Sequence, residues 1–579
     1  MCQKIAIIVL LIASMVIGNA QMLSSLKRRD QNLQKTIASL DPATGISIVQ
    51  GEKNAYWDYQ SWGSDDRHLW VTPEGHVHAV YFGCTGSNGE GALRNSFYVF
   101  SPDWGMTLNK PVRVEDIDAE FPAMDVLPDG RAVISSHNGR GHPYEMFVNV
   151  DSAAGAGNFS RYKAPIVPSN YGNTLVAAVS DTLVVLSGAS VAGNEHVMNI
   201  FNVNTKTFMH DENQIIFPGI KRQGTITIVS DKKGRAALLL LKFHGYPLAN
   251  DESSNNIWIQ ETRDGGLTWG EPVKLTHHSN NPSPVQTILG SNGLSAVYLH
   301  GELHVVYLVM IIDENDLTRV ECRLLHWSAG VNDGKPTVAV RWDSLHFGEL
   351  QNYPPFWEPH LGVDEKGILT MVFAGLSTDP KDVESFTGLP FPDVFAVSSK
   401  DNGLNWGEPK NLTNSPKIEE TTPYISAWNQ NGKINILYQT DTLPGPYPYG
   451  GDRFLGEIDH IFLQTDHPST EPYTPLTRVN SPAAQLPAEY NLRQNYPNPF
   501  NLSTIIEFSS PVKATISLSI YDVLGRKVKT LVEGEQSAGV HTIHWHGDDD
   551  LGCVLPAGVY FAKFIAGDVQ QSIKLILMK

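Results

Sequence analysis

The chain has 579 residues, of which 41% are hydrophobic, and a formal net charge of −18 at neutral pH. A chain of this length can build the cores of two or more domains. The negative charge lies in the middle of the chain, because the first 40 residues are net positive and the last 92 are close to neutral. Such an acidic body argues against nucleic-acid binding, which depends on clustered Lys and Arg. Cys84, Cys322 and Cys553 are too scattered for a disulfide framework or a site of closely spaced metal-binding thiols.

The N-terminus has the pattern of a secretory signal peptide. Lys4 precedes an apolar run over residues 5–17, and the small residues Gly18 and Ala20 stand at the expected cleavage positions. This run is too short to span a bilayer, and no later stretch approaches the length of a transmembrane helix. We therefore expect cleavage of residues 1–20 after Ala20 and a short N-terminal segment over residues 21–44. The mature protein is expected to be secreted or held at the outer cell surface, with no transmembrane span.

Between residues 45 and 467 one pattern recurs: an apolar strand, a tight turn rich in Gly or Asp, and a second apolar strand. The turns lie at residues 73–75, 128–130, 180–181, 232–234, 300–301, 365–367 and 430–432. Spacings of roughly 50 to 70 residues suit the four-stranded blades of an all-β propeller with long loops. Seven turns favour seven blades, and six blades are the alternative if the unit at Ser180 is irregular. The last blade has three strands of its own, so we expect residues 46–49 to complete it as its outer strand.

A second repeated motif supports this fold class. Residues 262–269 (TRDGGLTW) and 399–406 (SKDNGLNW) follow the spacing S/T-x-D-x-G-x-T-W, and residues 101–108 (SPDWGMTL) are a degenerate copy with Leu at the Trp position. The Asp carboxylate can accept backbone N–H groups across a tight hairpin, and the Gly permits a positive φ. The motif resembles the Asp box of sialidase-like, BNR-repeat propellers. That resemblance implies structural rather than catalytic roles for Asp103, Asp264, Trp269, Asp401 and Trp406.

The end of the chain forms a separate segment. A Pro-rich stretch over residues 468–487 is expected to act as an extended linker. Alternating apolar and polar residues in 488–579, punctuated by glycines, predict the short strands of a small Ig-like β-sandwich. The succession of residues 494–501 (QNYPNPFN), 520–526 (IYDVLGR), 539–545 (GVHTIHW), 556–561 (PAGVYF) and 574–579 (KLILMK) resembles the C-terminal sorting domain of type IX secretion cargo. The resemblance implies export, with the type IX secretion machinery as the partner of this domain.

The turns and the Asp boxes are predicted to share one end of the blades, so the loops at the opposite end are free to hold a ligand. These loops place aromatic rings beside polar and charged groups, a combination that suits sugar rings. An alternative is that the aromatic side chains pack the loops against one another. We expect the indole rings of Trp57 and Trp357 to be exposed and to stack on a sugar. The candidate ligand-contacting residues are Trp57, Asp58, Arg140, His142, Tyr144, Glu145, Trp357, Glu358, His360 and Arg453.

Three functions are compatible with these patterns. A secreted protein that binds carbohydrate or another surface ligand is favoured, and the alternatives are a glycoside hydrolase or related polysaccharide-degrading enzyme and a structural surface or adhesion protein. A sialidase needs an arginine cluster for the substrate carboxylate, but the Arg-Ile-Pro motif that opens sialidase catalytic domains is missing between Ala20 and Arg67. The sequence therefore leaves catalysis open. No cofactor is expected, and no metal, because His76, His78 and the pair at 277–278 lack a third ligand at a telling distance.

Overall fold

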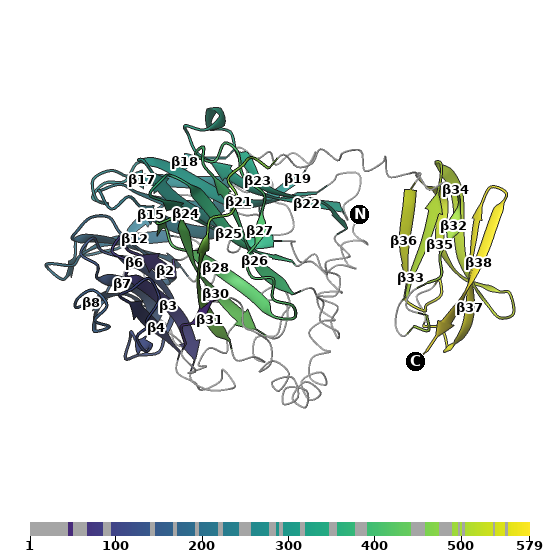
Figure 1. Cartoon of the computed structure of the whole chain (residues 1–579), viewed down its shortest axis with the longest axis horizontal. Helices are drawn as coiled ribbons and strands as arrows, with labels where there is room; N and C mark the ends of the chain where they lie inside the picture. Colours follow the sequence, from purple (N-terminus) through teal and green to yellow (C-terminus); the bar gives the residue numbers. More distant parts are fainter. Residues whose placement is uncertain are drawn as a thin grey trace. The chain divides into compact units, whose positions relative to one another are not determined.

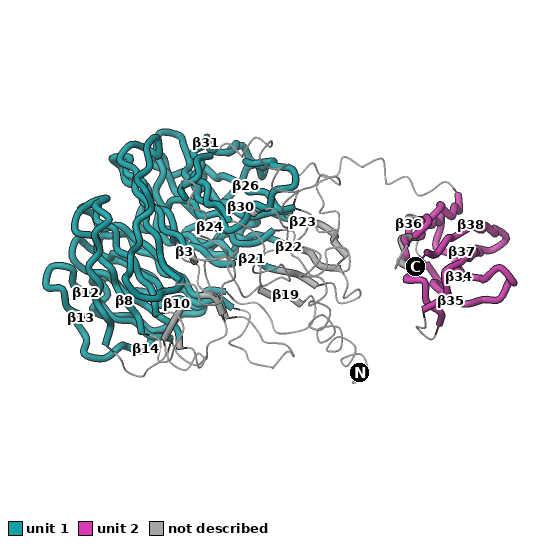
Figure 2. Tube along the Cα trace, turned by 90° about the horizontal axis from the view of Figure 1, so that it is seen from below, with its two compact units in different colours: residues 1–473 teal, residues 474–579 magenta. Residues whose placement is uncertain are grey.

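The computed structural model separates the chain into two compact units, residues 1–473 and residues 474–579 (Figures 1 and 2). The residues that the structure describes are 45–49, 67–84, 94–138, 145–165, 171–190, 196–217, 224–242, 256–276, 285–288, 293–312, 319–346, 356–376, 391–441, 458–473, 489–495, 498–500, 504–536, 539–550 and 554–578. Their one helix is the short 3₁₀ turn η1 (Asn332–Gly334). Within these ranges no helix has the length and apolarity needed to cross a membrane.

The described part of the first unit contains seven sheets, one around each predicted turn. Blade 1 consists of β2 (Leu69–Val71), β3 (Val77–Cys84), β4 (Arg94–Ser101) and β5 (Val112–Arg113). Blade 2 consists of β6 (Ala119–Val126), β7 (Ala132–Asn138), β8 (Met146–Asp151) and β9 (Phe159–Lys163). Blade 3 consists of β10 (Tyr171–Ala178), β11 (Leu183–Ser190), β12 (His196–Asn202) and β13 (Thr207–Phe208), with β14 (Gln214–Ile216) also paired to β12.

The remaining four blades follow the same order. Blade 4 consists of β15 (Gly224–Ser230), β16 (Ala236–Lys242), β17 (Asn256–Thr262) and β18 (Val273–Lys274). Blade 5 consists of β19 (Val285–Ile288) and β20 (Leu294–Leu299), both paired to β21 (Glu302–Ile312), then β22 (Arg319–Trp327) and β23 (Thr337–His346). Blade 6 consists of β24 (Phe356–Asp364), β25 (Leu369–Leu376), β26 (Pro392–Ser399) and β27 (Lys410–Asn411), with β29 (Trp428–Asn429) parallel to β24. Blade 7 consists of β28 (Glu419–Ile425), β30 (Lys433–Asp441), β31 (Asp459–Asp466) and β1 (Ile46–Ser47).

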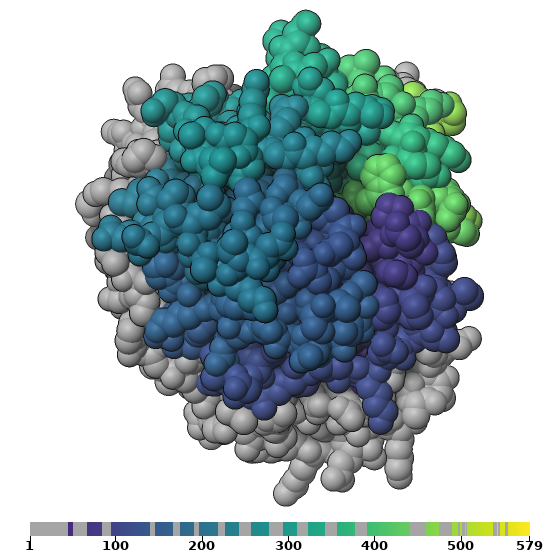
Figure 3. All heavy atoms as spheres, turned by 90° about the vertical axis from the view of Figure 1, so that its left-hand side faces the viewer, coloured from purple at the N-terminus to yellow at the C-terminus, as the bar shows by residue number. Residues whose placement is uncertain are grey.

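The blades form a closed ring. Their first strands contact one another in the order β2, β6, β10, β15, β20, β24, β28 and again β2. β1 completes blade 7 by pairing with β31, with Ile46 opposite Phe462, and the backbone N–H of Val71 donates to Ser426 Oγ at 2.9 Å between blades 1 and 7. In Figure 3 the purple N-terminal part of the described chain accordingly lies between blue and green parts. The prediction of a seven-bladed β-propeller, closed by an N-terminal strand, is confirmed.

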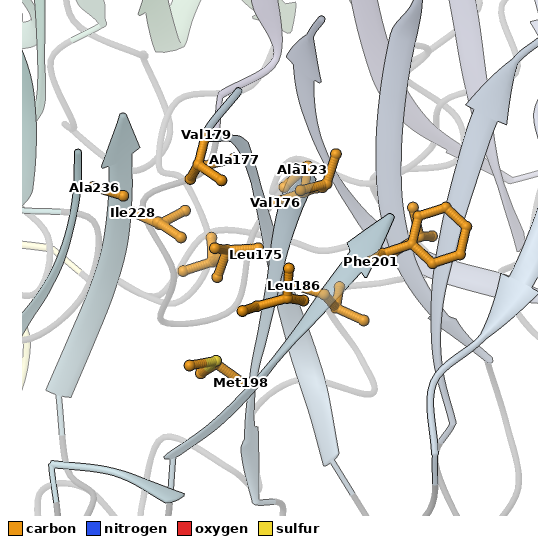
Figure 4. Close-up of a cluster of buried hydrophobic side chains, with 14 of the residues drawn as sticks. Ala123, Leu175, Val176, Ala177, Val179, Leu186, Met198, Phe201, Ile228 and Ala236 are labelled. Atoms are coloured by element: carbon orange, nitrogen blue, oxygen red, sulfur yellow. The ribbon is translucent and has the colours of Figure 1, made fainter. Parts of the chain in front are cut away.

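The first strands are buried on both faces, because a neighbouring blade covers each side. They therefore read as continuous buried runs instead of alternating ones, and every residue of β6, β24 and β28 is buried. Between blades 2, 3 and 4, the side chains of Ala123, Leu175, Leu186, Phe201 and Ile228 belong to one apolar cluster (Figure 4). Complete burial of a side chain such as Leu175 contributes about 2 kcal/mol, so packing between blades is the main force that holds the ring together.

The second unit is a sandwich of two sheets. One contains β32 (Asn491–Leu492), β33 (Thr504–Ser510) and β36 (Gly539–Trp545). The other contains β35 (Lys527–Gln536), β34 (Ala514–Asp522), β37 (Gly558–Ala566) and β38 (Val569–Leu577). Phe508, Leu518, Trp545, Phe564 and Leu575 share a single buried core between them. The predicted small Ig-like sandwich is confirmed.

Residues 468–473, at the start of the stretch expected as a linker, lie against blade 6. Glu471 forms an ion pair with Lys400 at 2.7 Å, and the backbone N–H of Tyr473 donates to the carbonyl of Trp406 at 2.8 Å. A Cβ at Gly407 would lie 1.8 Å from the carbonyl oxygen of Ser469, so the close approach of the two chains requires glycine there. We therefore expect the extended part of the linker to begin after residue 473.

The hairpins at residues 101–108, 262–269 and 399–406, which have the sequence pattern that resembles the Asp box, contain the hydrogen bonds that this pattern predicts. In blade 4, Asp264 Oδ1 accepts the backbone N–H of Thr268 at 2.9 Å, and Oδ2 accepts the Thr268 hydroxyl at 2.6 Å. Asp103 and Asp401 bind the residue four positions ahead in the same way, in blades 1 and 6. Each of the three carboxylates thus accepts hydrogen bonds within its own hairpin, a task for which an Asp at this position is suited.

In two further hairpins, which the sequence motif does not identify, an Asp or Asn side chain also accepts backbone N–H groups of the turn. Asp151, the last residue of β8 in blade 2, accepts the backbone N–H groups of Gly157 and Asn158, each at 3.0 Å. Asn202, the last residue of β12 in blade 3, accepts those of Asn204 and Thr205 at 3.0 and 3.1 Å. The available signal is an Asp or Asn at the end of a third strand, since a short polar side chain there can bind the turn that follows.

The glycines of the hairpins at residues 101–108 and 399–406 lie directly against the preceding blade. A Cβ added to Gly105 of blade 1 would lie 2.3 Å from the ring of Phe462 in blade 7, and one added to Gly403 of blade 6 would lie 2.3 Å from the ring of His326 in blade 5. Both glycines also have positive φ, of 84° and 83°. The Gly of the motif therefore serves the turn and the contact between blades at once.

Gly403→Ala is expected to destabilise the protein more than Gly432→Ala. Both positions have positive φ, 83° and 69°, which costs alanine about 1–2 kcal/mol. Nothing lies within 4 Å of a Cβ at Gly432, whereas overlap with His326 adds roughly 1–3 kcal/mol at Gly403. Thermal and denaturant unfolding of the two variants beside wild type measures the difference. Equal losses would show that the contact between blades 5 and 6 tolerates a methyl group.

Candidate functional site in the central channel

The two ends of the propeller differ in what they carry. Two sets of hairpins lie together at one end of the propeller, here called the turn end: those between first and second strands, and those with the Asp-box pattern. In blade 1 a hydrogen bond joins the two, because the backbone N–H of Trp104 donates to the carbonyl of Gly75 at 2.8 Å. The first strands begin at the opposite end, here called the loop end. Six of the ten candidate ligand residues fall outside the described part of the chain: Trp57, Asp58, Arg140, His142, Tyr144 and Arg453.

Glu145 is described, but it does not meet the other described candidates. Its carboxylate pairs with Lys163 Nζ at 2.5 Å, and Lys163 belongs to β9, the outermost strand of blade 2. Its backbone N–H donates to Asn138 Oδ1 at 2.6 Å. Glu145 therefore ties together the outer part of its own blade.

Trp357, Glu358 and His360 all belong to β24, the first strand of blade 6. Trp357 is 1% exposed and packs in a small buried cluster with Ala374 and Leu376. The expectation of an exposed indole that stacks on a ligand is therefore wrong for Trp357. The physical reason is that β24 begins at Phe356, so that Trp357 lies inside a strand covered by neighbouring blades and not in the preceding loop.

A strained bulge interrupts β24 beside these residues. The pairing of β24 with β25 shifts between Trp357 and His360, and Glu358 has a φ of 53° although it precedes a proline. Phe121 of β6 and Thr422 of β28, each also followed by a proline, have φ values of 50° and 48° at equivalent shifts. A left-handed conformation is unfavourable for these residue types, and a following proline disfavours helical conformations further. Strain repeated in three first strands points to a functional constraint at the loop end.

The bulges of blades 6 and 7 are joined by a hydrogen-bonded contact. Glu358 Oε2 accepts the backbone N–H of Thr422 at 2.9 Å, and the Thr422 hydroxyl donates to Gln439 Oε1 at 2.7 Å. Glu358 is 7% exposed. A buried carboxylate is thereby held against the first strand of the next blade, with its position set by the strained backbone on both sides.

Aromatic rings continue this contact into blade 1. The ring centroids of His360 and Tyr424 are 4.7 Å apart. His68 stacks on Tyr424, with centroids 4.3 Å and planes 13° apart. His68, Tyr424 and His360 come from blades 1, 7 and 6. Sequence reasoning found His360 but missed His68 and Tyr424, because these residues precede or lie within short strands and carry no motif.

Burial keeps the histidines of this region neutral. It lowers the pKa of His360 to about 3, with Arg67 and His68 contributing in the same direction. It also lowers the pKa of His68 to about 3, opposed by a hydrogen bond to the carbonyl of Val80. His460, next to Tyr81 at 4.8 Å, has its pKa lowered to about 3 by burial and then by His68. A neutral imidazole can donate one hydrogen bond and accept another, so the loop end has polar rings without positive charge on them.

Charged residues from three blades meet deeper in the channel and bind backbone groups of two further blades. Arg67 Nη2 of blade 1 donates to the carbonyl of Ala296 in blade 5 at 2.5 Å. Asp125 Oδ1 of blade 2 lies 2.7 Å from Lys232 Nζ of blade 4, and Asp125 Oδ2 accepts the backbone N–H of Ala178 in blade 3 at 2.8 Å. Burial lowers the pKa of Arg67 to about 10, and the Asp125 carboxylate acts against that shift. These contacts bridge the ring across its centre.

Lys232 is further held by an aromatic ring. Its Nζ lies 3.6 Å from the centroid of the Trp70 ring, a cation–π contact between blades 4 and 1. The same ammonium group also donates to the carbonyl of Val126. Burial lowers the pKa of Lys232, and Asp125 opposes this effect. Over the described ranges, no group of three His, Cys, Asp or Glu side chains is arranged to hold a metal ion.

Comparisons with known proteins give one sequence family and a set of similar folds. Residues 501–566 match the family model of the FlgD Ig-like domain. A comparison with curated protein sequences gives no match. Among solved structures, the polysaccharide lyase Uly1 is similar at 11% identity and a TM-score of 0.43, over 70% of this chain and 91% of that chain.

Two further similar structures are fungal enzymes. The α-L-arabinanase of Penicillium chrysogenum, complexed with arabinobiose, is 10% identical with a TM-score of 0.35, over 60% of this chain and 93% of that one. The α-L-arabinofuranosidase ARB93A of Fusarium graminearum is 12% identical with a TM-score of 0.36, over 59% of this chain and 94% of that one. At such TM-scores the likeness carries no inference about activity, and the fold rests on the strand topology itself.

His460→Phe is expected to make the protein less sensitive to acid. The pKa of His460 is about 3 in the folded state against an ordinary value of 6.5, so the unfolded chain binds a proton first as the pH falls. The stability of the neutral ring is fully present above pH 6.5 and is lost toward pH 3, at up to about 1.4 kcal/mol per pH unit. Among the described residues neither ring nitrogen of His460 has a hydrogen-bond partner, so Phe should fold well at neutral pH.

The measurement is the melting temperature of wild type and His460→Phe between pH 7 and pH 4. The variant should lose less stability than wild type over this range, whereas substitution of the exposed His300 by Gln should leave the wild-type slope intact. Parallel curves for wild type and His460→Phe would contradict a neutral, buried His460.

Proposed function

We propose that this protein is an exported carbohydrate-binding β-propeller that holds its ligand at the loop end of the channel. The observation that carries the proposal is the convergence of Glu358, His360, Tyr424 and His68 from three blades, beside two strained backbone bulges. Buried ionisable groups with shifted pKa values and strained backbone are concentrated at functional sites in proteins. Tyr424 also packs in an apolar cluster with Ile48 and Leu69. Apolar side chains would fill the positions of Glu358, His360 and His68 more favourably if packing were the only task of these groups.

Carbohydrate is the ligand class that best suits this region. A sugar ring presents apolar C–H faces and hydroxyl edges, which need aromatic surface and hydrogen-bonding groups side by side. Tyr424 with the two histidine rings, and Glu358 with Gln439, bring both kinds of group to the first strands. In this proposal the buried residues support the surface, and Trp57, Asp58, Arg140, His142, Tyr144 and Arg453 supply the direct contacts.

Cleavage of the bound glycan is a second candidate function. Glycoside hydrolysis uses two carboxylates that flank the scissile bond. Glu358 is favoured as one of them, because a strained bulge and a hydrogen bond from the next blade fix its carboxylate. Glu420 lies two residues from Thr422, the partner of Glu358, and is fully buried, which makes it the candidate for the second. A purely structural adhesion protein would have no need for these groups.

Export completes the proposal. The signal peptide over residues 1–20 directs the chain across the inner membrane, and residues 488–579 act as a type IX sorting domain. The FlgD-type Ig-like match over residues 501–566 is compatible with that role. The Asp boxes make the propeller a member of the sialidase-like, BNR-repeat group in this proposal, with a structural task for Asp103, Asp264 and Asp401.

Glu358→Gln is expected to weaken glycan binding by at least about tenfold, the equivalent of 1.4 kcal/mol. Glutamine keeps an oxygen that can accept the Thr422 N–H, so the bulge and the fold should survive while the negative charge is lost. Affinity electrophoresis against a panel of neutral and acidic polysaccharides measures binding, and release of new sugar ends measures cleavage. Glu408→Gln, an exposed residue of the same blade, is the matched control.

Unchanged binding in Glu358→Gln, with the control also unchanged, would place the ligand elsewhere. Retained binding with lost release of sugar ends would favour the hydrolase over the binding protein. If wild type binds none of the polysaccharides, the carbohydrate proposal itself fails.

Deletion of residues 488–579 should leave a folded propeller that accumulates in the periplasm. Each unit has a buried core of its own, so the melting temperature of the truncated propeller should match that of the propeller in the full chain. Cell fractionation in a host with type IX secretion locates the truncated protein. A fusion of residues 468–579 to a periplasmic reporter should reach the surface. Normal surface display of the truncated chain would contradict the sorting role.

A further inference from the structure

At the turn end the channel opens into a cavity of about 970 Å³, here called the turn-end funnel. Its lining comes from all seven blades, from the turn of Glu74 in blade 1 to Trp428 between β28 and β30 of blade 7. We propose that the funnel binds the basic N-terminal segment of this same chain, residues 21–44, through the side chains of residues 27–29 (KRR). The inference goes beyond the proposed function, because the funnel and the proposed glycan site lie at opposite ends of the channel.

The lining of the funnel is acidic. It contains six carboxylates against three cationic side chains, which leaves a net charge of −3 when histidine is neutral. The cationic side chains are Arg67, Lys232 and Lys233, and Lys232 is already paired with Asp125 at 2.7 Å. The carboxylates belong to Glu74, Asp125, Asp181, Asp231, Asp364 and Glu365. Like charges that share a cavity repel one another, so the funnel favours a cationic occupant.

The carboxylates at the rim of the funnel have no cation of their own. Glu74 and Asp181 form no ion pair and accept no hydrogen bond within the part of the chain that the structure describes. Asp231 accepts backbone N–H groups of its own turn, and Glu365 accepts one from the next blade, at 2.7 to 3.0 Å. Backbone N–H groups orient these carboxylates but do not cancel their charge. A cationic side chain at the rim would therefore be attracted from several blades at once.

A buried carboxylate of the lining adds to this uncompensated charge. The side chain of Asp364 is 0% exposed. Its Oδ1 accepts the backbone N–H groups of Lys366 and Ile368 at 2.9 and 2.7 Å, whereas its Oδ2 accepts no hydrogen bond from the described residues. His467 Nε2 lies 3.4 Å from that oxygen, but burial lowers the pKa of His467 against the opposing effect of Asp364, so the ring is neutral at neutral pH. A buried charge is costly unless it is paired, and a cationic group in the funnel would offset this one.

The walls of the funnel suit the long side chains of Lys and Arg, whose apolar stems pack on apolar surface while their charged ends remain polar. Two aromatic rings of the lining already hold cations: Trp70 lies 3.6 Å from Lys232 Nζ, and Tyr298 lies 5.4 Å from the guanidinium of Arg235. The third ring, that of Trp428, has no cation against it among the described residues, and its buried Nε1 has no hydrogen-bond partner there. A cation from the N-terminal segment can stack on Trp428 as the other two cations do.

The identity of the occupant follows from charge and reach. Residues 21–44 lie outside the described part of the chain, and they contain four cationic side chains and two carboxylates. β1 pairs antiparallel with β31, a third strand that ends at the turn end, so the chain reaches Gly45 from the turn end. Lys27 precedes Gly45 by 18 residues, which is about 60 Å of extended chain. Only three strand spacings, about 14 Å, separate the outer strand of a blade from its first strand, so residues 27–29 can reach the funnel.

The covalent link favours this segment over a separate basic molecule. A segment tethered close to its site has an effective concentration on the order of mM. A modest intrinsic affinity is therefore sufficient to fill the funnel, and a basic partner in solution would have to displace the segment first.

Trypsin cleavage of the mature full-length protein tests the inference. Trypsin cuts after Lys and Arg in accessible chain, so a bound segment is protected. Cleavage after residues 27–29 should be at least about tenfold slower in the protein than in a free peptide of residues 21–44, and about 1 M salt should remove most of this protection by screening. Mass spectrometry of the released N-terminal fragments measures the rate. Cleavage as fast as in the free peptide would overturn the proposal.

Glu74→Gln combined with Asp181→Asn should speed this cleavage by at least about fivefold, because it removes two rim carboxylates from exposed positions. Asp129→Asn combined with Glu408→Gln is the matched control with the same change in net charge. Asp129 lies in the equivalent turn of blade 2, pairs with Arg131 at 2.7 Å and, like Glu408, does not line the funnel. The control should stay within about twofold of wild type, and melting temperatures verify that both variants fold. Unchanged protection in the rim variant, or an equal loss in the control, would overturn the role of the funnel.

A calorimetric titration with pentalysine distinguishes the chain's own segment from a separate basic ligand. The triple variant Lys27→Gln, Arg28→Gln, Arg29→Gln should bind pentalysine at least about tenfold more tightly than wild type, because its own segment no longer competes for the funnel. Equal affinity in the two proteins would overturn the segment as the occupant and leave a site for a basic partner. Absence of binding to the triple variant would overturn the funnel as a site for cations.

Discussion

A ring of sheets is stable only when its two ends join, and the pairing of β1 with β31 makes that join. Without β1, blade 7 would present the open edge of β31 to solvent, a row of unpaired backbone groups. The hydrogen bond from Ser47 Oγ to Asp459 Oδ1, at 2.6 Å, connects residues that are 412 positions apart. Closure therefore depends on contacts that form only after the whole propeller has been assembled, and contacts of this separation form slowly. The first strands of blades 1 and 7, β2 and β28, gain their second covering face from this closure.

The two ends of the ring differ in their backbone strain. At the turn end each hairpin satisfies its own backbone, and the glycines at 105 and 403 rest directly on the preceding blade. At the loop end the first strands of blades 2, 6 and 7 contain bulges with positive φ before proline. Such strain persists only where the surrounding structure fixes it. A ring that is rigid at one end can hold strained side chains at the other, which is how many scaffolds position a site.

Electrostatics differ along the channel in a way that follows from burial. Near the loop end the imidazoles of His68, His360 and His460 are kept neutral, because a charged ring would lose its hydration there. Deeper in the channel burial lowers the pKa of Arg67 and of Lys232, and the Asp125 carboxylate opposes both shifts. The positive charge of Arg67 also lowers the pKa of His360.

The sequence by itself determined the local features: the seven turns, the Asp-box hairpins, the blade order and the sandwich. These depend on a few adjacent residues, such as an Asp that binds the backbone four positions ahead, so their physics is present in a short stretch of chain. Tertiary structure alone decided which side chains meet. His68 and Tyr424 touch because the ring closes, and no local pattern records that contact. Trp357 was expected in a loop at the end opposite the turns. Burial between two blades instead extends β24 back to Phe356 and places the indole in the core.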